Sequence, residues 1–138
     1  MTRHTLSQYG DVHYYNYAAD CQDPSTYPEA RFVSEHGFQS FPSLSSYMSV
    51  TDKADRDMSS DLMDYRQRHG NGNAEVLAMM SRHFPVPGKS RPGDADSFEM
   101  YVWMTQVQQG RCYETAINQW RRLWSDATVR TAGVLSGN

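Results

Sequence analysis

The pattern of apolar and polar positions predicts two short strands in the first third of the chain. Residues 11–15 alternate and are rich in valine and tyrosine, which is typical of a strand. Residues 31–34 have the aromatic and β-branched content of a short buried strand, and the sequence turns polar at Glu35 and breaks at Gly37. Prolines among polar residues predict a loop over 16–29, between the two strands.

The rest of the chain has mainly helical spacing. Pro42-Ser43 resembles a helix start, and residues 51–68 read as a polar surface segment with a helical turn or two. Asn73 is expected to cap a helix over 74–83. The apolar stripe of that helix consists of Val76, Leu77, Met80 and Phe84.

A proline-rich loop over 85–93 precedes the longest predicted element. Asp96 and Glu99 resemble a capping box that opens a long helix, in which Gly110 is the weak point. Its apolar residues at helical spacing are Phe98, Tyr101, Val102, Cys112, Tyr113, Ile117, Trp120 and Trp124. Residues 131–135 give a final short strand signal.

Composition and charge exclude two classes of partner. The formal net charge of the 138 residues is −3, and basic and acidic residues are interspersed, so we expect no nucleic acid or anionic membrane partner. No apolar run approaches the roughly 20 residues that span a bilayer. The first eight residues lack the apolar middle of a signal peptide. Protonation of all five histidines would add five positive charges and bring the formal charge to +2.

The candidate chemistry centres on Glu35, a carboxylate placed where a predicted strand stops. The carboxyl ends of barrel strands are where (β/α)8 enzymes hold their catalytic groups. On the strand over 11–15, His13 and Tyr15 share one face because side chains alternate with a period of two. Either a face of this strand aims a hydrogen-bonding ring at Glu35, or its aromatic residues simply pack; the sequence leaves both open.

These residues carry a resemblance to a known family. The segment Ser34–Ser40 and the Phe41-Pro42-Ser43 after it resemble the nucleophile segment of the glycoside hydrolase family 2 enzymes that include the animal lysosomal β-mannosidases. The similarity extends to residues 10–15, 65–69 and 104–109. It covers most of this chain and a small part of such an enzyme.

The resemblance implies an α/β fold, namely a partial (β/α)8 TIM barrel. A complete barrel needs about 250 residues, so residues 1–138 would be a C-terminal fragment of the catalytic domain. It would hold about the last three strands, with long covering helices. The final helix would cover the nucleophile strand from outside the barrel.

The resemblance also implies an activity and a site. The activity is retaining hydrolysis of terminal, non-reducing β-D-mannose residues from oligosaccharides and glycoproteins, in the lysosome and without a cofactor. Glu35 matches the nucleophile, and His13, Tyr15 and Tyr17 are the candidates for orienting it or binding substrate. In the family the acid/base is a glutamate that follows asparagine. This sequence has no Asn-Glu pair, so that group is expected upstream of Met1 and the isolated chain is expected to be inactive.

The two cysteines, Cys21 and Cys112, are too few for a metal cluster. The residues alone allow either two free buried thiols or a disulfide. The resemblance to an enzyme of the oxidising secretory route favours a Cys21–Cys112 bridge.

The residues also allow two other function classes to be compared with a glycosidase. A metal hydrolase is disfavoured because no His-Glu-x-x-His spacing occurs, and we expect no metal. The glycines of residues 69–73 lack the Lys-Ser/Thr ending of a phosphate-binding loop. A non-enzymatic module that binds a partner through its long aromatic helix remains the alternative to the enzyme.

Overall fold

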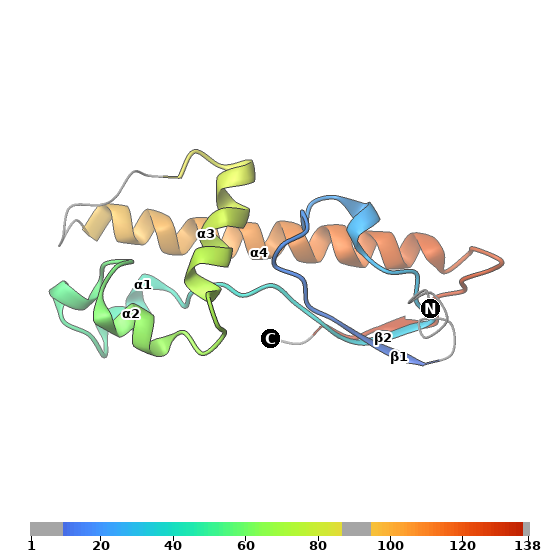
Figure 1. The fold of residues 1–138 in the computed structure, drawn as a ribbon, viewed down its shortest axis with the longest axis horizontal. Helices are drawn as coiled ribbons and strands as arrows, with labels where there is room; N and C mark the ends of the chain where they lie inside the picture. Colours follow the sequence, from blue (N-terminus) through green and yellow to red (C-terminus); the bar gives the residue numbers. More distant parts are fainter. Residues whose placement is uncertain (1–9, 87–94, 137–138) are drawn as a thin grey trace. The chain divides into compact units, whose positions relative to one another are not determined.

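The computed structural model describes residues 10–86 and 95–136, which form a small parallel sheet and a set of helices. Figure 1 shows the strands β1 (Asp11–Tyr14) and β2 (Phe32–His36) lying side by side. A third strand, β3 (Gly133–Val134), pairs with the other edge of β2, and both pairs are parallel. The expected α/β class is therefore confirmed. Within the described ranges, no helix combines the length and apolar character needed to cross a bilayer.

The strand boundaries differ from the predicted ones by one or two residues. β2 runs two residues beyond Ser34, because Glu35 pairs with His13 and His36 pairs with Tyr14 across the ladder. The predicted boundary at Ser34 is therefore two residues short, since pairing with a neighbour overrides the polar character of the sequence, but Glu35 does lie at the carboxyl end of the strand as predicted. β1 ends one residue earlier than predicted, and β3 is shorter at both ends.

The chain between β1 and β2 contains only a short 3-10 helix, η2 (Pro24–Thr26). Asp23 caps it by accepting a hydrogen bond from the Ser25 amide at 2.8 Å. The loop predicted for residues 16–29 is thus confirmed. Two neighbouring parallel strands are joined here without the usual crossover α-helix.

The described residues divide into two compact units. The first comprises residues 10–38 and 109–136 and has a core between the sheet and the last part of helix α4 (Ala95–Leu123). Trp120 is fully buried in it, and its indole nitrogen donates to the Pro28 carbonyl at 2.9 Å. The other buried members of this core are Tyr27, Ala30, Val33, Ala116, Leu123 and Val129. The last part of α4 therefore covers one face of the strand that carries Glu35.

Helix α4 differs from its prediction at both ends. It begins at Ala95, so Asp96 lies in the first turn and not at the cap. It continues through Gly110 without a break and ends at Leu123. Trp124 is 70% exposed and so does not belong to the buried stripe. Side chains with helical spacing stay on one face only while the helix continues.

The second unit, Gln39–Gln108, is mainly helical. Its elements are α1 (Leu44–Met48), the 3-10 helix η3 (Lys53–Asp55), α2 (Asp61–Arg66), α3 (Gly72–His83) and the first part of α4. Ser43 caps α1 as expected, with its side chain accepting from the Ser46 amide. Its core holds Phe41, Tyr47, Met63, Phe98 and Val102.

Helix α3 starts two residues before the predicted position. Asn71, in a left-handed conformation with φ 61°, occupies the cap, and Asn73 lies inside the helix. Asparagine adopts this conformation more readily than most residues. In the predicted stripe Val76 and Met80 are buried, but Leu77 is exposed. The predicted loop over 85–93 lies mostly outside the described residues.

Candidate active site

Glu35 is the second-to-last residue of β2, at the carboxyl end of the parallel sheet. Its side chain is 49% exposed and lies on the face of the sheet opposite the core. Val33 and His36, on the same strand, are buried. The carboxylate is therefore held by a rigid ladder but remains accessible.

Two side chains of the neighbouring segment reach the same oxygen of Glu35. The Tyr15 hydroxyl donates to Glu35 Oε2 at 3.5 Å, and His13 Nδ1 lies 3.5 Å from that oxygen. Both rings are about half exposed. Of the two possibilities that the sequence left open, the structure has the one in which rings lie at Glu35, namely those of His13 on β1 and of Tyr15 directly after β1.

Tyr17 packs its ring against Phe38, with a centroid distance of 5.1 Å. Phe38 follows β2 by two residues and is buried. These contacts bring His13 and Tyr15 to the Glu35 carboxylate and bring Tyr17 to the chain segment just after β2.

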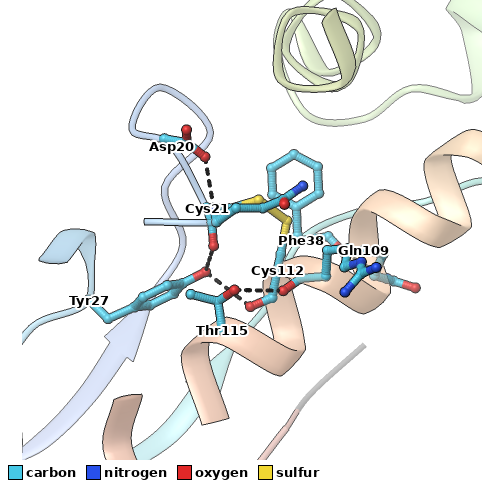
Figure 2. Close-up of a disulfide and its surroundings, with 9 residues drawn as sticks. Asp20, Cys21, Tyr27, Phe38, Gln109, Cys112 and Thr115 are labelled. Carbon is cyan, nitrogen blue, oxygen red and sulfur yellow. Dashed lines mark hydrogen bonds between the residues drawn. A yellow bond between two sulfur atoms is a disulfide. The ribbon is translucent and has the colours of Figure 1, made fainter. Parts of the chain in front are cut away.

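The two cysteines form a disulfide with a sequence separation of 91 residues. Figure 2 shows the bridge together with the Tyr27 hydroxyl, which lies 2.7 Å from the Cys21 carbonyl oxygen and 3.1 Å from the Cys112 carbonyl oxygen. Burial raises the pKa of Tyr27 well above its ordinary value, so the hydroxyl keeps the proton that these bonds use. The bridge and the tyrosine tie the loop between β1 and β2 to α4.

His36 is a buried titratable group that the sequence analysis did not single out. Its ring lies edge-on to Trp120 and Tyr113, at 4.9 and 5.2 Å between centroids, and Nε2 lies 3.0 Å from Ser136 Oγ. Burial lowers the pKa of His36 because the charged imidazolium loses its hydration.

This burial makes the chain less stable in acid. The unfolded chain takes up a proton on His36 near pH 6.5, whereas the folded chain resists protonation to a lower pH. The contribution of the neutral, buried His36 to the free energy of unfolding is complete above about pH 6.5. It is lost as the pH falls from there through the pKa of His36 in the folded chain. Urea unfolding at several pH values between 7.5 and 4.5 should show this loss.

The matched variant is His36→Phe, which keeps a buried ring but has no proton to bind. Its free energy of unfolding should fall less steeply with acid than that of the unchanged chain. Equal slopes for the two chains would show that His36 does not cause the acid sensitivity.

Within residues 10–86 and 95–136, no group of three or more histidine, cysteine or acidic side chains is arranged to hold a metal ion.

Asp11 is a site residue that sequence reasoning missed. Its carboxylate contacts both His13 and Ser34. The only sequence signal was its place at the start of a face shared with His13, two residues on.

No protein-family model matches the chain. It is 43% identical over 109 residues to a β-mannosidase of Rattus norvegicus, covering 79% of this chain and 12% of the relative. It is 38% identical over 131 residues to a β-mannosidase of Mus musculus, covering 93% of this chain and 15% of the relative. In structure it resembles the β-D-mannosidase of Dictyoglomus thermophilum, with a TM-score of 0.77 and 21% identity over 95% of this chain and 15% of that one.

The relatives are β-mannosidases, which are glycoside hydrolases, and the structural neighbour shares the fold of this chain. This chain is similar to one segment of these β-mannosidases. It spans only 12 to 15% of the length of the animal relatives.

Proposed function

We propose that this chain is the nucleophile-bearing part of a retaining β-mannosidase. The observation that carries the proposal is the position of Glu35, exposed at the carboxyl end of a parallel strand with His13 and Tyr15 at one of its oxygens. The sequence similarity to animal β-mannosidases supports it. The same similarity does not favour a helical module that only binds a partner.

The chain is, on this proposal, a C-terminal part of a (β/α)8 barrel domain. Its three parallel strands would be about the last three of the barrel, and α4 would be a covering helix. In such a barrel each strand packs one face against helices and turns the other to the interior. The burial of Val33 against α4 and the exposure of Glu35 fit this arrangement.

The reaction has two steps. A carboxylate oxygen of Glu35 attacks the anomeric carbon of a terminal β-mannose, and the bond from that carbon to the leaving oxygen breaks while an acid protonates that oxygen. The same acid group, now a base, then takes a proton from water, and the resulting attack on the anomeric carbon frees Glu35. Retaining enzymes place the two carboxyl groups about 5 Å apart.

The proposal also covers the groups around Glu35, the acid/base, the substrate and the compartment. His13 and Tyr15 hold the Glu35 carboxylate in the attacking orientation, and Tyr17 contributes to substrate binding. The acid/base comes from outside these 138 residues, because the sequence has no Asn-Glu pair. The substrate is a β-mannoside oligosaccharide, with no cofactor, and the site of action is the lysosome. The Cys21–Cys112 bridge fits an oxidising route to that compartment.

A chimera with mouse β-mannosidase tests the proposal. The matching segment of the mouse enzyme is replaced by that of this chain, and the product is assayed on an aryl β-mannoside. We expect turnover, because the host supplies the acid/base and the rest of the barrel. A 2-deoxy-2-fluoro-mannosyl fluoride should inactivate the chimera and leave its sugar on the peptide that contains Glu35. Attachment to a different residue would refute the assignment.

A further inference from the structure

β2 contains a bulge directly before Glu35. Val12 pairs with Val33 and the next residue, His13, pairs with Glu35, so Ser34 is an extra residue in β2. Side chains alternate between faces along a regular strand. If β2 were regular, with Ser34 paired in the ladder, Glu35 would lie on the same face as Val33, which is buried in the core. The bulge is therefore what turns Glu35 to the exposed face, next to His13.

Asp11 holds the bulge residue. Its Oδ1 accepts a hydrogen bond from the Ser34 amide at 2.9 Å, and its Oδ2 accepts one from the Ser34 hydroxyl. A bulge leaves its extra residue without a partner in the ladder, and here the carboxylate of Asp11 supplies the partner for that amide. Hydrogen bonds from Ser34 are also the main reason that the pKa of Asp11 is lowered, which keeps the group ionised.

The same carboxylate also reaches the ring that contacts Glu35. Asp11 Oδ2 lies 3.0 Å from His13 Nε2, and His13 Nδ1 lies 3.5 Å from Glu35 Oε2. Asp11 thus acts on Glu35 by two routes. It fixes the backbone on which Glu35 is carried, and it fixes the orientation of the imidazole beside it.

We propose that Asp11 is a positioning residue for the nucleophile: by binding Ser34 and His13 it keeps the bulge in place and sets the line of attack of Glu35. This inference rests on the proposed function of Glu35. A one-residue slip in register moves every side chain of a strand to the other face. A bulge that is not held could move along β2 in this way, and Glu35 would then leave the attacking position for part of the time.

The test uses Asp11→Ala and Asp11→Asn in the mouse chimera. Each preparation is first titrated with a slow 2-fluoro-mannoside that releases its aryl group in a burst, so that kcat is expressed per competent site. We expect Asp11→Ala to lower kcat per site by about 100-fold, the cost of a misplacement near 1 Å, with little change in KM. Asp11→Asn should lower kcat per site less, because the side-chain amide oxygen of asparagine can still accept a hydrogen bond from the Ser34 amide.

The matched control is Asp126→Ala. Asp126 is also exposed and also accepts from backbone amides, those of Thr128 and Val129, in the turn after α4. A purely structural role predicts a smaller burst with an unchanged kcat per site, which is the result we expect for Asp126→Ala.

Three outcomes are distinct. A large fall in kcat per site for Asp11→Ala, with the fluorosugar label on Glu35, supports the inference. If kcat per site of Asp11→Ala is within twofold of that of the unchanged chimera and the label is still on Glu35, the inference is overturned and the proposed function is left intact. A label on another residue overturns both.

Discussion

Replacement of Glu35 by glutamine should abolish β-mannoside hydrolysis by the mouse chimera, with a fall in kcat on the order of 10⁴-fold. The neutral amide of glutamine cannot form the glycosyl ester through which a retaining enzyme works. The two side chains have nearly the same size, and Glu35 is half exposed, so the fold should be unaffected. Initial rates on an aryl β-mannoside, with circular dichroism to check folding, measure the effect.

Two further variants make this experiment specific. Glu29→Gln changes an exposed glutamate in the loop before β2 and should leave kcat within about twofold, as surface changes away from a site usually do. Glu35→Ala should regain turnover when azide is added, because azide fills the space of the lost carboxylate and attacks from the same side. The product should be the α-mannosyl azide. Full activity of Glu35→Gln would show that the nucleophile is a different residue.

Removal of the disulfide should lower the free energy of unfolding of the chain by about 4.6 kcal/mol. The bridge joins residues 91 positions apart, and in the chain-entropy model a loop of that length restricts the unfolded state by roughly this amount. The loss is large beside the 5–15 kcal/mol that holds a typical domain folded. Urea unfolding of the chain with Cys21→Ser and Cys112→Ser together, compared with the unchanged oxidised chain, measures it.

Reduction supplies the control for this variant. Dithiothreitol should move the unfolding midpoint of the unchanged chain to nearly that of the double variant, and it should leave the double variant where it was. If the oxidised chain and the double variant unfold at the same urea concentration, the bridge contributes no stability. Two reactive thiols in the native, unreduced chain would show that the bridge does not form.

The pattern of apolar and polar residues was sufficient to predict the main helices and strands, because it reflects the local conformational preferences of the chain. Alternation located β1, helical spacing located α3 and α4, and prolines located the loop between β1 and β2. Element ends were less well predicted. The pattern predicts that β2 ends at Ser34, but ladder pairing with β1 extends it to His36, and such pairing depends on a segment that lies far away in the sequence.

The sequence by itself identified Glu35 as the candidate nucleophile, since Glu35 and its flanking residues resemble a nucleophile segment. Only the tertiary structure decided which way Glu35 faces. A strict period of two would bury it with Val33, and the extra residue Ser34, held by Asp11, reverses this. The physical reason is that a bulge forms between two strands, through a hydrogen bond from an amide in one to a carboxylate in the other. The residues of one strand alone do not contain that information.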